Sequence, residues 1–93
     1  MPNQVRASHI LVKTEAESLN LLFDIKHGTS FEDTAKKHSL CPSGKKGGDL
    51  GWFGRGQMVK EFETSAFSLP VGELSRPVKT QFGWHIIKVT ETK

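Results

Sequence analysis

Apolar residues dominate positions 5–12, near the start of the chain. In an extended strand, Ala7, His9 and Leu11 lie on one face, and the residues between them lie on the other. Both faces are largely apolar, which is typical of a central strand covered on each side. The pattern therefore predicts a buried strand that carries a histidine.

Two helical patterns follow. Residues 14–27 begin with Thr14 as a candidate N-cap and end before Gly28, which can supply a left-handed stop. Ser30 is the candidate cap of a second helix that runs to about residue 39. The expected inward stripe of the first helix consists of Leu19, Leu22, Phe23 and Ile25, and that of the second includes Phe31 and Ala35.

The remaining pattern alternates between short strands, a helix and turns. Residues 40–57 are rich in glycine, with a short strand expected at 50–53. Residues 59–67 predict a helix, and 70–73 a turn. The expected inward side chains of this helix are Phe62, Ala66 and Phe67.

Residues 78–80 and 84–90 predict a hairpin that bends at 81–83. His85 shares a face of its last strand with Ile87 and Val89. The order is then strand, two helices, strand, helix and two strands, which predicts an α+β fold around one mostly antiparallel sheet. Because 93 residues support one core, residues 1–93 are expected to form a single domain.

Composition excludes some classes of function. Apolar residues make up 35% and charged residues 25%, and the net charge is +3. The excess of basic residues is modest, so no nucleic-acid partner is expected. A weak nucleic-acid or membrane-surface binder stays an alternative because of four lysines, Lys36, Lys37, Lys45 and Lys46. No segment has the roughly 18 apolar residues of a membrane span, and residues 1–13 lack signal-peptide features. The single cysteine favours a reducing, cytoplasmic setting.

Two histidines, His9 and His85, occupy similar positions on predicted strands. One such histidine is usually a core residue with satisfied nitrogens, but two on neighbouring strands can hydrogen-bond to each other or through a hydroxyl. Thr80 is a candidate for that hydroxyl. With Cys41 the two histidines could ligate zinc, but the spacing follows no metal motif and a fourth ligand is not evident, so no metal is expected.

Cys41 has two interpretations that the residues leave open. It could be a thiol activated by a histidine, or a small, partly buried loop residue. The following segment, Ser43–Gly48, faintly resembles a phosphate-binding loop, but Lys46 stands where such a loop needs Ser or Thr. A solvated turn, with positive φ at Gly47 and Gly48, is expected instead.

Met58, Phe62 and Phe82 come from separate predicted elements. They could simply fill the core, or they could form an apolar cup about the size of a proline ring. The residues alone do not decide between these interpretations.

Several blocks resemble the parvulin family of prolyl isomerases. They are Ala7–Val12, Ser43–Met58 (SGKKGGDLGWFGRGQM), Phe62–Phe67, Val71–Val78 and Phe82–Ile87. The resemblance extends from about Val5 to Val89 in the family's order. The short length and the Cys-Pro-Ser-Gly-Lys run are most similar to small, stand-alone bacterial parvulins.

The resemblance implies a four-stranded antiparallel sheet surrounded by three to four helices. It also implies that His9 and His85 are the paired central histidines, that Thr80 is linked to them, and that Cys41 is the active-site residue, an Asp in some relatives. Met58, Phe62 and Phe82 would form the proline pocket, with Leu50 at its rim and Gln81 in the loop beside it.

The expected function is therefore peptidyl-prolyl cis/trans isomerisation of proline-containing peptides and folding proteins, without a cofactor and as a monomer. A non-covalent role is preferred for Cys41. Phospho-specific parvulins carry a basic loop after the first strand, whereas here Val12-Lys13-Thr14-Glu15 connects directly, so no phosphate preference is expected. A non-catalytic peptide-binding or chaperone module is the main alternative.

Overall fold

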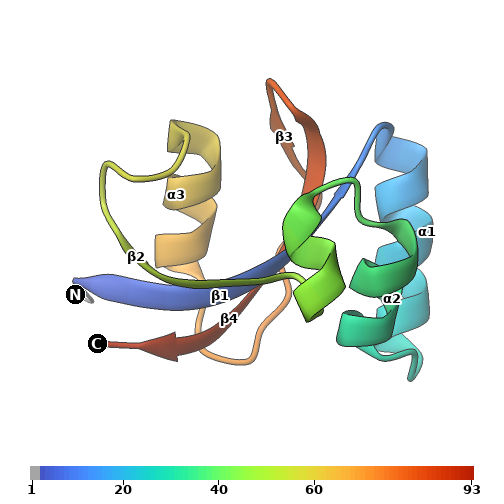
Figure 1. Ribbon diagram of the computed structural model, residues 1–93, viewed down its shortest axis with the longest axis horizontal. Coiled ribbons are helices and arrows are strands. Elements are labelled where there is room, and N and C mark those ends of the chain that lie inside the picture. Colours follow the sequence, from blue (N-terminus) through green and yellow to red (C-terminus); the bar gives the residue numbers. More distant parts are fainter. Residues whose placement is uncertain (1–2) are drawn as a thin grey trace.

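The computed structural model describes residues 3–93 and contains one four-stranded sheet. All neighbouring strands pair antiparallel, in the order β2-β1-β4-β3 (Figure 1). The strands are β1 (Gln4–Val12), β2 (Asp49–Gly54), β3 (Val78–Thr80) and β4 (Gly83–Thr92). The predicted α+β fold and the central place of the first strand are confirmed. Met1 and Pro2, part of the predicted 1–93 domain, lie outside the described residues.

The helices begin where the sequence indicates. Thr14 Oγ1 accepts the Glu17 N–H at the start of α1 (Glu15–Lys26), and Ser30 Oγ accepts the Asp33 N–H at the start of α2 (Phe31–His38). The third helix is α3 (Lys60–Ser68). A 3-10 helix, η1 (Pro42–Lys46), lies in the segment expected to be a turn, and it ends at Gly47 and Gly48, which have the predicted positive φ of 71° and 89°.

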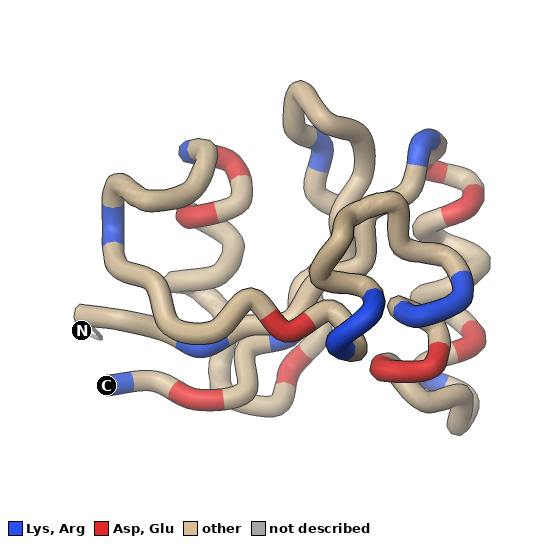
Figure 2. The backbone as a smooth tube through the Cα atoms, in the orientation of Figure 1, with Lys and Arg blue, Asp and Glu red and all other residues tan. Residues whose placement is uncertain are grey.

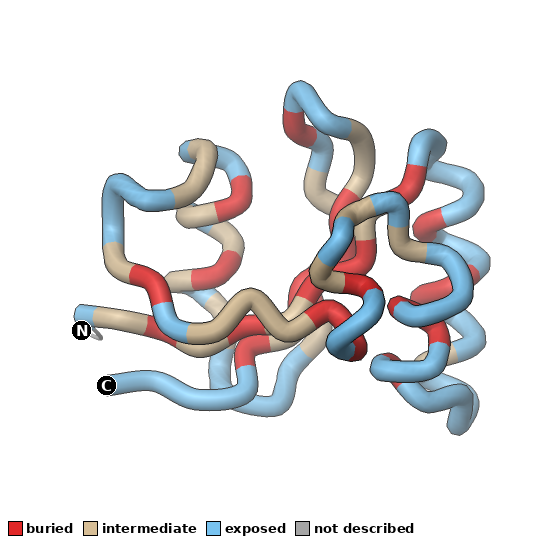
Figure 3. The backbone as a smooth tube through the Cα atoms, viewed as in Figure 1, coloured by how far each residue is buried: buried red, intermediate tan, exposed pale blue. Residues whose placement is uncertain are grey.

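The sheet separates two apolar clusters, because successive side chains of a strand point to opposite faces. One cluster lies between the sheet and α3, and the other lies between the sheet and the pair α1 and α2. Figure 1 shows α3 well separated from α1 and α2, and Figure 3 shows the buried positions running along β1 and the inward sides of the helices. The first cluster comprises Val5, Ala7, Phe53, Phe62, Ala66, Ile87 and Val89, and the second Ile10, Val12, Leu21, Leu22, Phe31, Ala35 and Ile86.

The predicted inward stripe of α1 is wrong at two positions. Leu19 and Phe23 are 49% and 59% exposed, whereas Ser18, Leu21 and Leu22 are buried. The helix can bury Ser18 because its hydroxyl donates to the Glu15 carbonyl at 2.6 Å, so the polar side chain is satisfied locally. The stripe is therefore rotated toward Ser18, a position that a purely apolar pattern leaves out.

Charged residues of both signs are interspersed over the described backbone (Figure 2). Arg6 on β1 contacts Asp49 at 2.8 Å and Glu91 at 3.1 Å, and so joins three strands. The lysines of α2 and η1 lie near acidic positions at the start of α2 (Figure 2). None of the helices within residues 3–93 is long and apolar enough to cross a membrane.

Candidate active site

His9 on β1 and His85 on β4 lie side by side on the face of the sheet that α3 covers. Leu11 pairs with His85 and His9 with Ile87, so the two histidines are diagonal neighbours. Their Nδ1 atoms are 2.9 Å apart, and the rings are stacked with an interplanar angle of 17°. The two residues are only 5% and 4% exposed. The structure thus brings together two imidazoles that are 76 residues apart.

Thr80, at the end of β3, extends this pair into a chain of hydrogen bonds. Its Oγ1 accepts the Phe82 N–H at 3.2 Å and lies 2.7 Å from His85 Nε2. If the Thr80 hydroxyl donates its proton to His85 Nε2, the His85 proton lies on Nδ1. His85 Nδ1 then donates to His9 Nδ1, and His9 carries its own proton on Nε2. Among residues 3–93, that nitrogen has no hydrogen-bond partner.

Both histidines are held neutral. Burial lowers the pKa of His9 from 6.5 to about 4, with the neighbouring His85 as a second cause. Burial also lowers the pKa of His85. Phe62 of α3 reinforces this apolar setting, since its ring meets each imidazole edge-on at a centroid distance of 5.4 Å. The histidine pair is therefore polar but uncharged.

The backbone of His9 is held by Gly48. The His9 N–H donates to the Gly48 carbonyl at 2.9 Å. A Cβ atom at Gly48 would lie 2.4 Å from the His9 carbonyl oxygen, and φ at Gly48 is +89°. Only glycine allows this approach without a shift of the backbone. The glycine-rich segment therefore helps to place His9.

An apolar cleft of about 510 Å³ opens above the histidines. Seven of the predicted site residues line it, from strands β1, β2 and β4, helix α3 and three loops: His9, Cys41, Leu50, Met58, Phe62, Phe82 and His85. Phe82 is 61% exposed, so it stands at the rim and does not close the cup. Thr80 lies behind His85 and does not line the cleft. Gln81 lines a neighbouring hollow with Val59, Lys60 and Thr80.

Cys41 is a free, partly exposed thiol immediately before η1. Although it lines the same cleft as the histidines, no hydrogen bond within residues 3–93 joins its sulfur to either ring. The expectation that the histidines tune Cys41 therefore stays a prediction. In the described part of the chain, no three His, Cys, Asp or Glu side chains gather as a metal site.

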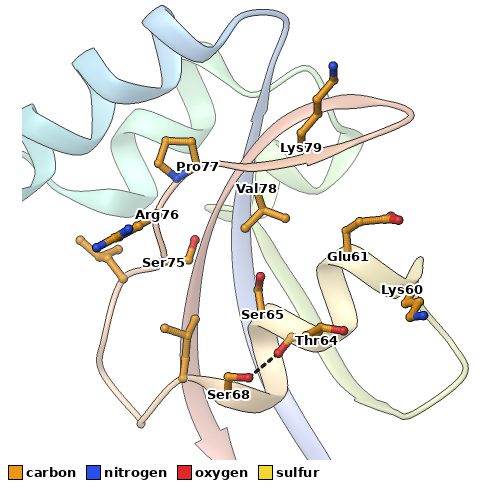
Figure 4. A pocket seen from close by; sticks show the side chains of 12 residues that line it. Lys60, Glu61, Thr64, Ser65, Ser68, Ser75, Arg76, Pro77, Val78 and Lys79 are labelled. Atoms are coloured by element: carbon orange, nitrogen blue, oxygen red, sulfur yellow. Dashed lines mark hydrogen bonds between the residues drawn. The ribbon is translucent and has the colours of Figure 1, made fainter.

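Five lining residues were not predicted, namely Leu11, Leu40, Pro42, Gln57 and Val59. A signal for each was present, because Leu11 shares a strand face with His9, and the others flank Cys41 or Met58 in sequence. A larger hollow lies elsewhere, between α3 and residues 74–79, with a volume of about 860 Å³ (Figure 4). It contains none of the histidines or Cys41, so the smaller cleft is the better candidate site.

A model of the PPIC-type PPIase (peptidyl-prolyl isomerase) domain matches residues 1–93. This chain belongs to that family, the parvulins. The parvulin of Nitrosopumilus maritimus, in its solution structure, is 46% identical and superposes with a TM-score of 0.88 over 98% of this chain and 99% of that one. The expected resemblance to small stand-alone parvulins is thus confirmed.

Longer proteins also contain this parvulin domain. Foldase protein PrsA of Geobacillus kaustophilus is 54% identical over 95% of this chain and 32% of its own length. The crystal structure of the peptidylprolyl isomerase PrsA from Bacillus anthracis has a TM-score of 0.97 and 45% identity, covering 99% of this chain and 43% of that one. This parvulin therefore spans about a third of the length of the curated relatives it matches.

Proposed function

We propose that this chain accelerates rotation about X-Pro peptide bonds in peptides and folding proteins. The observation that carries the proposal is the apolar cleft built over an uncharged histidine pair, in a chain of the PPIC-type PPIase family. The longer relatives named foldases support folding proteins as the substrate class.

The cleft suits this reaction because the barrier to rotation about the X-Pro bond comes from amide resonance. Amide resonance raises the rotation barrier to ~18–20 kcal/mol, and the planar amide is more dipolar than the twisted one. An apolar cup that grips the proline ring, built here from Met58 and Phe62 with Leu50 and Phe82 at its rim, therefore favours the twisted state. A thousandfold acceleration needs only ~4 kcal/mol of such preference. No bond breaks, so the proposed reaction requires no cofactor.

Cys41 is proposed to act without forming a bond to the substrate. Its thiol lines the cleft wall, where its polarity can weaken the double-bond character of the prolyl amide. The buried histidines then hold the geometry and polarity of the cleft floor. Their depressed pKa values favour this scaffold role over proton transfer, since both rings stay neutral near pH 7.

No preference for phosphate before proline is proposed. Only Lys13 and Thr14 connect β1 to α1, so this connection carries a single basic side chain. Glu15 opens α1 directly after it and would repel a phosphate.

The proposal also includes a monomeric state and a reducing, cytoplasmic setting. The single free thiol supports the reducing setting. Light scattering coupled to gel filtration tests the oligomeric state, and fractionation of the producing cell tests the location.

Two-dimensional exchange NMR on X-Pro peptides tests the function. Catalytic amounts of the protein are expected to speed cis/trans exchange of an unphosphorylated peptide, and a phosphorylated serine before proline should give no advantage. Peptide shift changes without faster exchange would instead indicate a peptide-binding module.

A further inference from the structure

Beyond Ser8, β1 loses its pairing with β2, and the loop that carries Cys41 takes the place of the missing strand. β1 pairs with β2 only as far as Ser8 opposite Asp49. The Leu40 N–H then donates to the Leu11 carbonyl at 2.8 Å, in the same loop whose Gly48 accepts from His9. These links are made by backbone atoms, which a side-chain substitution does not remove.

One link in this series uses a side chain. Ser39 Oγ accepts the Leu11 N–H at 3.1 Å and also accepts the Cys41 N–H at 3.4 Å. A single oxygen therefore joins β1, two residues after His9, to the backbone of Cys41. Together with the backbone bond from Leu40 to Leu11, it ties the backbone of Cys41 to the strand that carries His9.

Ser39 is itself firmly placed. Its N–H donates to the Ala35 carbonyl at 3.0 Å at the end of α2. On its other side lies Gly44 of η1, where an added Cβ would stand 3.0 Å from Ser39 Cβ and 2.8 Å from the Ala35 carbonyl oxygen. The hydroxyl is thus packed between α2, η1 and β1, although Ser39 does not line the cleft.

We propose that Ser39 is a positioning residue for the isomerase reaction and acts through Cys41. This inference rests on the proposed function. Without the hydroxyl, the N–H groups of Leu11 and Cys41 lose their acceptor, while the backbone bonds that join Leu40 and Gly48 to β1 remain. Cys41 can then shift only partly relative to His9. Because misplacement by 1 Å can cost about a hundredfold in rate, a partial shift in Ser39→Ala should slow catalysis by about tenfold.

Ser75 provides a matched control. Its Oγ accepts the Ile87 N–H at 2.9 Å, so Ser75→Ala also removes a serine acceptor from a strand backbone group. Ser75 lies in the hollow beside α3 and away from the cleft (Figure 4). Both variants are to be compared by exchange NMR at saturating peptide, at a temperature where urea unfolding shows each to be folded.

The expected result is an exchange rate at saturation about tenfold lower in Ser39→Ala, with a peptide dissociation constant within about twofold of wild type. Ser75→Ala should match wild type in both. In a Cys41→Ala background, assayed at high enzyme concentration, Ser39→Ala should add no further loss, because the side chain that it positions is gone.

Three results would overturn the inference: an unchanged Ser39→Ala, an equal loss in Ser75→Ala, or a full additional loss in the Cys41→Ala background. An inactive wild type would instead refute the proposed function, so the two failures are distinguishable.

Discussion

His9 and His85 illustrate how a buried polar pair can serve a site without carrying charge. Each imidazole loses hydration on burial, and each recovers one hydrogen bond from the other at 2.9 Å. Burial disfavours the charged form of both rings and lowers the pKa of each, and for His9 the neighbouring His85 is a second cause. The pair is therefore suited to shaping the cleft floor, with Cys41 and the apolar cup facing the substrate.

This pair should make the stability of the fold depend on pH. The unfolded chain binds a proton on His9 near pH 6.5, whereas the folded chain does so only near pH 4. Between these values the unfolded state binds more protons, so stability is lost as the pH falls from 6.5 to 4. For His9 alone the loss is about 3 kcal/mol, and the lowered pKa of His85 adds to it with the same sign.

Urea unfolding at several pH values between 7 and 4.5 measures this effect. The exposed His38 on α2 provides a control, since His38→Gln should retain the loss of stability. A free energy of unfolding that stays constant down to pH 4.5 would contradict the neutral pair.

Cys41→Asp is expected to keep activity within about tenfold of wild type, because a carboxylate can supply polarity beside the amide but is a poor amide nucleophile. The position before η1 is partly exposed, so the substitution does not bury a charge. A protease-coupled proline peptide assay measures the activity. A loss beyond about a thousandfold, or about 4 kcal/mol, in a folded variant would support covalent attack instead.

At the scale of elements, the glycine-rich segment before β2 allows two backbone segments to pack closely against each other. Gly48 lets the loop approach β1 closely enough for the His9 N–H to bond to it, and the Gly48 N–H in turn donates to the Ser43 carbonyl at 2.9 Å. The loop is therefore tied to η1 on one side and to the histidine strand on the other.

Gly48→Ala should lower the free energy of unfolding by at least about 2 kcal/mol more than Gly72→Ala. Both glycines have a φ of +89°, so both variants incur the left-handed strain of a Cβ atom. Only at Gly48 does the new Cβ also meet backbone atoms, since nothing lies within 4 Å at Gly72. Urea unfolding measures the difference, and equal losses would show that the close approach to His9 is not a constraint.

Elements with a clear period could be predicted from the sequence, and elements defined by packing could not. The apolar character of both faces of residues 5–12 predicts the central strand, and the period of two in β4 predicts the shared face of His85, Ile87 and Val89. The inward face of α1 was misjudged because Ser18, buried by a local hydrogen bond, looks polar while exposed Phe23 looks like core.

At the scale of the whole molecule, the site is assembled from β1, β2, β4, α3 and three loops. The predicted residues that meet at the cleft were inferred largely from the family resemblance, because periodicity does not indicate which loops fold over a sheet. Ser39 was missed for the same reason. Its bond to Leu11 spans 28 residues and depends on the path of the loop after α2.

The apolar cleft over the histidine pair is proposed to catalyse rotation about X-Pro bonds. The most direct test is the cis/trans exchange rate of a proline peptide, measured by NMR with wild type, Met58→Ala and Leu19→Ala. Met58 lines the cleft, whereas Leu19 is an exposed residue on α1. Faster exchange is expected with wild type and Leu19→Ala, and a loss of about tenfold in this acceleration with Met58→Ala. Equal exchange in the two variants, or no acceleration by wild type, would contradict it.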